Sequence, residues 1–267
     1  MTLELRKFDM ASIPSGKVIV FIGKRETGKS FLVKDLLYYH QDMPVGTVIS
    51  GTEGANAFYS KMMPSIFIHN EFTDTVVHNY VKRQKKIVKR FNETNNVDPR
   101  AFMILDDCLY DNSWVKNTDI RALFMNGRHF KSTLIITMQY ALGIPPNLRT
   151  NIDYIFILRE NIQSNRKRLY EQYAGMFNNL EIFNQVMDHC TENYECLVIN
   201  NNSRSNKLED QVFWYKADSH DNFKIGHPSA WKYHNENYDP GHDDSDEEYD
   251  FNARRKKRGT FLNVKKV

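Results

Sequence analysis

The sequence predicts an α/β fold, with a mainly parallel central sheet flanked by helices. Along much of the chain, short apolar runs rich in Val and Ile alternate with stretches whose apolar residues recur at helical spacing, as in βαβ units. A glycine-rich turn joins one such run directly to a helical stretch, and another run ends in two adjacent carboxylates. Together these observations favour an open sheet whose functional groups lie at the carboxyl ends of its strands.

Composition limits the class of protein. A chain of 267 residues with 41% hydrophobic content can bury one sizeable core. Its formal net charge of +3 indicates no partner by itself. Three cysteines without a Cys-x-x-Cys pair form neither a disulfide framework nor a zinc site, so we expect a reducing compartment. The N-terminus has no apolar leader and no apolar run is long enough for a membrane span, so we expect neither secretion nor a transmembrane segment.

The predicted strands follow the apolar runs. The first is residues 18–22, where four of the five side chains are β-branched. Further strands are expected at 47–50, 66–68, 101–105, 133–137 and 154–158. Two later runs, 196–199 and 212–215, are joined through a turn-rich stretch that begins with three asparagines, which predicts a hairpin at the C-terminal edge of the sheet.

Two helical patterns fill the gaps between these strands. One begins near Thr73, a suitable N-cap residue, and places apolar residues at 77, 81, 88 and 91 on one face. The other contains Val115, Leu123 and Phe124.

The pattern of alternating elements ends near residue 218. We therefore expect one domain over residues 1–218 and a charged, disordered tail over residues 219–267. The tail contains an acidic block at 243–250 followed at once by a basic block at 254–258, and such blocks with few apolar anchors are typical of disorder.

The glycine-rich turn at residues 23–30 fits the pattern Gly, four free positions, Gly-Lys and Ser or Thr. Between a strand and a helix this pattern is a P-loop, so the predicted core is that of a P-loop NTPase that binds ATP. Lys29 would reach the β and γ phosphates, and the Ser30 hydroxyl would ligate Mg²⁺. The alternative is a glycine turn that binds nothing. The expected nucleotide contacts are Gly23, Lys24, Arg25, Glu26, Thr27, Gly28, Lys29, Ser30 and Phe31.

The strand at 101–105 runs into Asp106 and Asp107. Because ligands lie beyond the carboxyl ends of parallel strands, Asp106 is expected beside the Mg²⁺ held by Ser30. Asp107 could polarise the attacking water as general base. The alternative for both is a capping or solvated carboxylate.

Two further residues are catalytic candidates. Gln139 follows the strand at 133–137 and could hydrogen-bond the γ-phosphate or the attacking water, and the alternative is a turn residue. Arg128 closes the preceding helix and could reach a neighbouring subunit's γ-phosphate in a ring. A cation at a helix C-terminus needs no catalytic role, so that alternative stays open. Arg121 and Arg149 are lesser candidates.

Together these features resemble the genome-packaging ATPases of nucleocytoplasmic large DNA viruses, the poxvirus-like branch of the FtsK–HerA superfamily. The resemblance covers residues 17–173. Its specific points are the P-loop, Gly51-Thr52-Glu53 followed by Phe58-Tyr59 and Pro64, Asp106-Asp107, and Gly127-Arg128 eleven residues before Gln139.

The resemblance implies a homo-oligomeric ring that uses ATP and Mg²⁺ to move double-stranded DNA into a preformed capsid. It also implies contacts with capsid or membrane-vertex proteins, at assembly sites in the host cytoplasm or in the virion. The superfamily mostly has Asp-Glu where this chain has Asp106-Asp107. The missing methylene retracts the second carboxylate by about 1.3–1.5 Å, so Glu53 is a competing general base.

A basic helix supports a nucleic-acid partner independently of the resemblance. Six of the nine residues at 82–90 are cations, which could contact DNA phosphates without reading sequence. A solvated helix face is the alternative. The six are Lys82, Arg83, Lys85, Lys86, Lys89 and Arg90.

Two other functions remain open on the sequence. A small-molecule kinase would use Arg159, Arg166 and Arg168 as a lid over two nucleotides. A nucleotide-dependent assembly scaffold would bind ATP without turnover.

Overall fold

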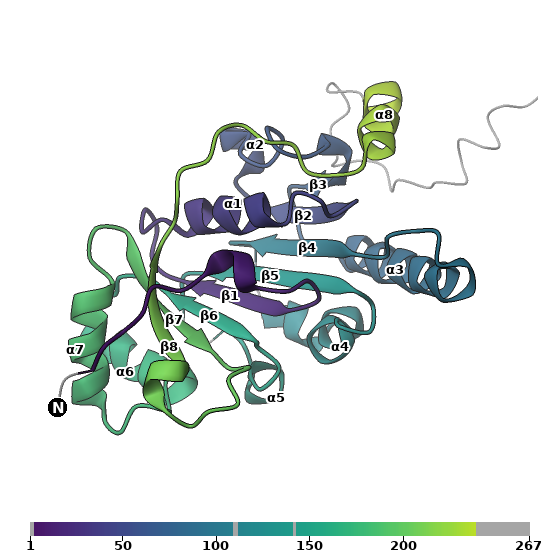
Figure 1. The fold of residues 1–267 in the computed structure, drawn as a ribbon. Coiled ribbons are helices and arrows are strands. Elements are labelled where there is room, and N and C mark those ends of the chain that lie inside the picture. The colour runs from purple at the N-terminus through teal and green to yellow at the C-terminus, as the bar shows by residue number, and fades with distance from the viewer. Residues whose placement is uncertain (1–2, 109–111, 141–142, 239–267) are drawn as a thin grey trace, which may run out of the picture.

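The computed structural model describes residues 3–108, 112–140 and 143–238. Its centre is an eight-stranded sheet in the order β3-β2-β4-β5-β1-β6-β7-β8 (Figure 1). β1 to β6 pair in parallel, whereas β7 and β8 add an antiparallel hairpin at one edge. The predicted α/β fold with a mainly parallel sheet and an edge hairpin is confirmed. The strands are β1 (Val18–Ile22), β2 (Gly46–Ser50), β3 (Ile68–His69), β4 (Ala101–Asp106), β5 (Ser132–Met138), β6 (Tyr154–Ile157), β7 (Glu195–Asn200) and β8 (Val212–Lys216).

Helices cover both faces of the sheet (Figure 1). α1 packs on one face with the N-terminal segment, and α3 to α7 pack on the other. Within the described ranges, no helix combines the length and apolar character needed to cross a membrane. The α-helices are α1 (Lys29–Tyr39), α2 (Glu53–Asn56), α3 (Asp74–Thr94), α4 (Thr118–Asn126), α5 (Pro146–Arg149), α6 (Gln163–Tyr173), α7 (Leu180–Cys190) and α8 (Pro228–Asn237). Short 3-10 turns occupy Met10–Ser12, Ser65–Phe67, Asn112–Lys116 and Leu208–Asp210.

The central strands are buried on both faces. Every residue of β1, β2, β4, β5 and β6 is buried. Because neither face meets water, these strands need no polar alternation, which explains their unbroken apolar runs.

The predicted helix after Thr73 is confirmed, and the Thr73 hydroxyl accepts a hydrogen bond from the Val76 amide. The second helical pattern is divided in two. The Asn117 side chain accepts hydrogen bonds from the amides of Asp119 and Ile120, so it caps a new helix, α4, after the short turn at Asn112–Lys116.

The strand predicted at residues 66–68 lies further along the chain. Ser65–Phe67 forms a 3-10 turn, and only Ile68 and His69 pair with β2. A short apolar run cannot by itself distinguish a turn from a strand, which explains the shift.

The expectation of a disordered tail from residue 219 is wrong for residues 219–238. Phe223 and Ile225 are buried in the core beside α1, and the Ile225 amide donates to the Met62 carbonyl at 2.8 Å. The His220 imidazole stacks on Tyr38 of α1 at 3.7 Å and hydrogen-bonds the buried Asp35 carboxylate. This segment therefore ties α8 to the body of the domain (Figure 1). The acidic and basic blocks of the predicted tail lie outside the described residues.

Candidate nucleotide site

The loop between β1 and α1 has the backbone geometry of a phosphate cradle. Gly28 has φ +104°, a conformation that a side chain would strain, and it immediately precedes the first helical residue. At Gly23 an added Cβ would lie 2.7 Å from Thr27 Oγ1 and 2.8 Å from Leu158 Cβ, so only glycine fits. The Thr27 hydroxyl donates to the Lys24 carbonyl at 2.8 Å and closes the loop. The loop is therefore compact and leads directly into the start of α1, where the N-terminus of a helix stabilises an anion.

Lys29 lies inside this loop. Its Nζ donates to the carbonyls of Gly23 and Lys24 at 2.8 and 3.0 Å, and the side chain is 7% exposed. Nζ is also 3.9 Å from Asp107 Oδ2. Burial lowers the pKa of the ammonium, and the carboxylates of Asp107 and Asp106 oppose this shift. Phe31, two residues further on, is 68% exposed.

Parallel pairing places the acid pair beside the loop. β4 pairs with β5, and β5 pairs with β1, so Asp106 and Ile22, the last residues of β4 and β1, lie beside Thr137 and Met138 at the carboxyl end of β5. Thr137 fixes both acids there: its hydroxyl donates to Asp106 Oδ1 at 2.6 Å and accepts from the Asp107 amide at 3.0 Å. The sequence analysis did not identify Thr137, because it lies inside an apolar run.

Asp106 is buried, whereas Asp107 is partly exposed. Burial raises the pKa of the Asp106 carboxyl, and hydrogen bonds from Thr137 and Ser50 partly offset that effect. A cation would favour its ionised form. Mg²⁺ prefers a few oxygen ligands and keeps several waters, so the Ser30 hydroxyl and the Asp106 carboxylate suit it.

Asp107 and Gln139 are in direct contact. Gln139 Nε2 donates to Asp107 Oδ2 at 2.8 Å, the same oxygen that faces Lys29. Asp107 has φ +49°, so the chain turns sharply at the strand end and presents this carboxylate at the carboxyl edge. The structure thus brings together Lys29, at the start of α1, with Asp107 and Gln139, which directly follow β4 and β5.

Glu53 is not free to act as the alternative base. Its Oε2 accepts from the amides of Phe58 and Tyr59 at 3.0 and 2.9 Å, and its Oε1 accepts from the Ser60 amide at 2.8 Å. The side chain is buried and closes the loop after α2. Its carboxylate therefore has a structural role, which favours Asp107 over Glu53 as the general base.

A further acid at this edge, Glu160, was missed. It follows β6, and its carboxylate contacts Lys24 Nζ of the P-loop at 2.7 Å. Burial disfavours its charged form, but hydrogen bonds from Lys24, the Ile162 amide and Asn165 outweigh that effect and lower its pKa. The signal existed in the sequence, since Glu160 also follows a predicted parallel strand.

The kinase-type lid of arginines is not formed. Arg166 is buried, donates to the Glu160 carbonyl at 2.6 Å and pairs with Asp188 at 2.7 Å. Arg159 binds Asn161, and Arg168 lies against Tyr140, with its guanidinium 5.6 Å from the ring centre. Arg166 is therefore a structural residue of α6, and the lid interpretation is wrong for it.

Arg128 lies at the opposite edge of the sheet from the loop. The Gly127 carbonyl accepts from the amide of Ser132, the first residue of β5, and the Arg128 backbone lies beside Gly16, which precedes β1. Its side chain is exposed and contacts His129. Since β5 has seven residues at about 3.3 Å each, this edge is on the order of 20 Å from the acid pair. Arg128 therefore cannot reach the loop of its own chain.

The basic helix is α3, and its cations divide into two groups. Lys82, Lys86 and Lys89 recur at i, i+4 and i+7 and are exposed, opposite the face buried by Val77 and Val81. Lys85 and Arg90 are exposed on either side of that row, and Lys85 lies 5.5 Å from the Phe130 ring centre.

Arg83 differs from the other five cations. Its guanidinium lies 5.0 Å from the Tyr80 ring centre, and its Nε and Nη2 atoms are buried without a hydrogen-bond partner among the described residues. Burial lowers the pKa of this guanidinium. Arg83 is therefore a weaker candidate for contact with DNA phosphates than the five exposed cations.

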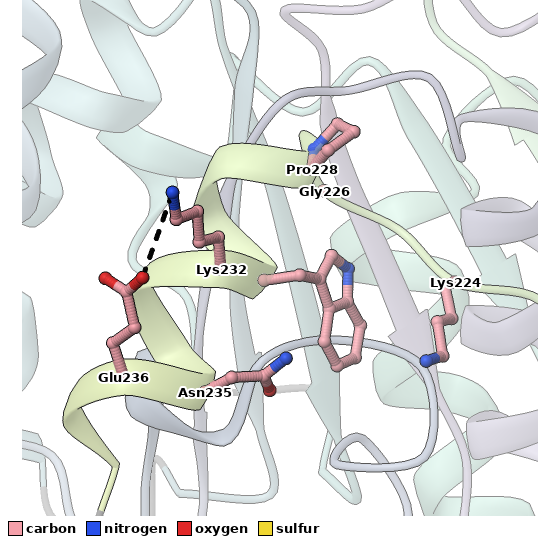
Figure 2. Close-up of a pocket in the computed structure, with 7 residues that line it drawn as sticks. Lys224, Gly226, Pro228, Lys232, Asn235 and Glu236 are labelled. Carbon is pink, nitrogen blue, oxygen red and sulfur yellow. Dashed lines mark ion pairs between the residues drawn. The ribbon is translucent and has the colours of Figure 1, made fainter.

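A separate groove lies beside α8. Figure 2 shows it between Lys224 and the residues of α8, with Lys232 and Glu236 paired at 3.9 Å. Its lining residues are Lys224, Gly226, Pro228, Trp231, Lys232, Asn235 and Glu236, none of which belongs to the P-loop or the acid pair.

Proteins of large DNA viruses are similar to this chain over most of its length. Protein L437 of Acanthamoeba polyphaga mimivirus is 39% identical over 242 residues, which cover 89% of this chain and 85% of that protein. Protein 075L of Invertebrate iridescent virus 6 is 40% identical over 204 residues, covering 76% of this chain and 78% of that protein. The chain belongs to the family of these viral proteins. No family model matches it.

Solved structures support the same fold. The genome-packaging NTPase B204 of Sulfolobus turreted icosahedral virus 2, in complex with ATP-γ-S, is similar with a TM-score of 0.52 at 14% identity, covering 75% of this chain and 96% of that one. EssC of Geobacillus thermodenitrificans, in its ATPases 2 and 3, has a TM-score of 0.52 at 16% identity, covering 77% of this chain and 41% of that one. The chain thus shares its fold with these NTPases, the genome-packaging NTPase B204 among them.

The contacts of Asp107 and Glu53, the two candidate bases, predict that substitution of the first affects turnover and substitution of the second affects stability. Asp107→Asn should lower the rate of ATP hydrolysis by about 100- to 10,000-fold with little change in stability, because it removes the proton acceptor and keeps the shape. Glu53→Gln should lower the free energy of unfolding by about 1–3 kcal/mol, because an amide cannot replace all three carboxylate contacts. Steady-state phosphate release and urea denaturation measure the two effects. Loss of turnover in a stable Glu53→Gln protein would return the role of base to Glu53.

Proposed function

We propose that the protein is an ATP-hydrolysing motor that moves double-stranded viral DNA into a preformed capsid. The observation that supports hydrolysis most directly is the contact of Asp107 with both Gln139 and Lys29 at the mouth of the P-loop. The fold shared with packaging NTPases supports the coupling to DNA. Membership in a family of viral proteins supports viral DNA as the cargo.

The proposed reaction uses each residue of the site in a defined way. Lys29 and the loop amides bind the β and γ phosphates, and Gln139 holds the attacking water beside Asp107. Asp107 accepts a proton from that water while the oxygen of the water bonds to the γ-phosphorus. The bond from the γ-phosphorus to the bridging oxygen then breaks, leaving ADP and phosphate. Mg²⁺, held by Ser30 and Asp106, would neutralise charge on the phosphates.

The groups at the carboxyl ends of these strands suit hydrolysis better than phosphoryl transfer to a second nucleotide. A kinase must exclude water and bind an acceptor, for which the arginine lid was the candidate. Arg166 is instead held by Glu160 and Asp188. An acid with an orienting amide beside it serves to activate water, which a kinase does not need.

The candidate site and Arg128 lie at opposite ends of the strands, which limits how subunits could be arranged in an assembly. We propose a homo-oligomeric ring in which Arg128 acts on the neighbour's γ-phosphate. For that, the amino edge of one sheet must face the carboxyl edge of the next. Such a head-to-tail interface is heterologous, and it closes into a ring when the rotation between successive subunits closes.

We further propose that the row formed by Lys82, Lys86 and Lys89 contacts DNA phosphates. The row is exposed and lies opposite the buried face of α3, so it can bind and release a backbone without refolding. Docking to capsid or membrane-vertex proteins, at assembly sites in the host cytoplasm or in the virion, completes the proposal.

A direct assay separates the motor from its alternatives. Phosphate release by the full chain should rise when long duplex DNA is added, and no phosphorylated product should form with nucleoside or nucleotide acceptors. Lys29→Ala should lower turnover by about 100- to 1000-fold, because it removes a cation aimed at the transferring phosphate. Formation of an acceptor product would favour the kinase, and nucleotide binding without turnover would favour the scaffold.

The trans role of Arg128 predicts complementation between two inactive variants. Arg128→Ala should bind ATP normally and lose about 1000-fold or more in turnover. Mixed with Lys29→Ala subunits it should regain activity, because each intact P-loop then meets an intact arginine from its neighbour. Lys131→Ala, at the same edge of the sheet, is the control and should remain active. Normal turnover in Arg128→Ala assemblies would contradict the role.

The basic row of α3 predicts a change in salt dependence. Replacing Lys82, Lys86 and Lys89 by Gln should weaken duplex binding and reduce the slope of log affinity against log salt by about 3, or about 1 for each lost contact. Fluorescence anisotropy with labelled duplex at several salt concentrations measures the slope. Lys232→Gln on α8, an equally exposed lysine, is the control. An unchanged slope would mean that these three lysines are a solvated helix face and do not contact DNA.

A further inference from the structure

Tyr194 is a large aromatic side chain placed in solvent next to the P-loop. It lies between α7 and β7 and is 68% exposed. A single exposed ring is common on protein surfaces, so the exposure of Tyr194 indicates no function without its backbone geometry and its place beside the P-loop. Tyr194 is one of the two most exposed large apolar side chains in the described part of the protein, together with Phe31.

The backbone at Tyr194 is strained. Asn193 has φ +49° and Tyr194 has φ +67°, and the Glu195 amide donates to the Glu192 carbonyl at 2.8 Å. These features define a tight turn with two left-handed central residues, for which Asn-Gly is the favoured sequence. A tyrosine in place of the glycine costs about 1–2 kcal/mol. The chain thus tolerates strain to keep an exposed ring at this position, as often occurs at functional sites.

The ring lies over the loop itself. Tyr194 Cδ1 is 3.6 Å from the position that a Cβ on Gly28 would take. The sheet explains this placement: β7 runs antiparallel to β6, with Leu197 opposite Ile157, and Ile157 is paired with Ile22 at the end of β1. The residue before β7 is therefore at the same edge of the sheet as the P-loop.

Tyr194 is on the side of the loop opposite the catalytic groups. Asp107 and Gln139 come from β4 and β5, on one flank of β1, whereas β6 and β7 form the other flank. If the γ-phosphate faces Asp107 and Gln139, as in the proposed function, the rest of the nucleotide extends over Gly28 and α1 toward β6 and β7. The base of the nucleotide would then lie where the ring of Tyr194 is exposed.

We infer that Tyr194 is the stacking platform for the base of the bound nucleoside triphosphate. This inference rests on the proposed function, because it needs a triphosphate in the P-loop. Stacking uses the face of the base, which every base has, and contributes about 1–3 kcal/mol. The ring therefore adds affinity for the nucleoside end of the ligand and none for its phosphates.

A comparison of two ligands tests the inference. Tyr194→Ala should weaken binding of MgATP by about 5- to 150-fold, which is the stacking energy converted to affinity. Binding of magnesium tripolyphosphate, which has the phosphates and lacks the base, should change by less than about twofold. Tyr194→Phe and Tyr194→Trp should retain ATP affinity. Tyr238→Ala, at an exposed tyrosine on the far end of α8, is the control. Isothermal titration calorimetry gives both affinities.

The other outcomes are each decisive. An equal loss of both ligands in Tyr194→Ala would mean that the ring only supports Gly28, and no loss of either would mean that the base lies elsewhere; both results overturn the inference. Tyr194→Gly adds a stability measurement: it should unfold at a higher temperature, because glycine relieves the turn, and still lose ATP affinity. Wild-type protein that binds neither ligand would refute the proposed function itself, together with this inference.

Discussion

The parallel pairing of β4 and β1 with β5 is the constraint on which the candidate site depends. It brings three strand ends to one edge, so that the P-loop lysine, the second acid and the amide can meet without any of them lying on a long flexible loop. The Thr137 hydroxyl then fixes the acids individually, with one contact to the Asp106 carboxylate and one to the Asp107 amide. A shift of the β4–β5 register by one residue would turn Thr137 to the other face and release both acids.

The carboxylates near the carboxyl ends of these strands differ in burial and contacts, and these differences indicate different roles. Asp106 is buried and accepts hydrogen bonds from two hydroxyls, which suits a fixed partner for a cation. Asp107 is more exposed, and one of its oxygens faces both Lys29 and Gln139. Glu53 has the longer side chain expected of a base, but three backbone amides hold it in a loop. The environment of each acid, rather than the length of its side chain, therefore indicates its task.

Much of the fold and the centre of the site could be predicted from sequence, because both follow from one-dimensional rules. Apolar runs give buried strands, and the residues after parallel strands share an edge; this rule located Asp106, Asp107 and Gln139. Residues whose roles depend on packing could not be found in this way. Arg83 lies at the border of the buried face of α3, where helical periodicity does not determine whether a long side chain turns inward. Thr137 lies within an apolar run, and its contacts exist only once β4 is beside it. Phe223 and Ile225 belong to a polar segment whose two apolar residues are too few to show a period.

The two edges of the sheet also limit how a nucleotide could be shared between subunits. Within one chain, the loop, the acids and Tyr194 all lie at the carboxyl ends of the strands, and in the proposed complex they would surround the nucleotide from its phosphates to its base. The exposed Arg128 is on the order of 20 Å away at the amino edge, so no rotation of its side chain completes the site. A subunit could therefore bind ATP alone while its hydrolysis awaits a neighbour. In the proposed ring, this separation would make turnover depend on the interface. A change at that interface, such as one caused by DNA passing through the ring, would then alter hydrolysis without altering nucleotide affinity.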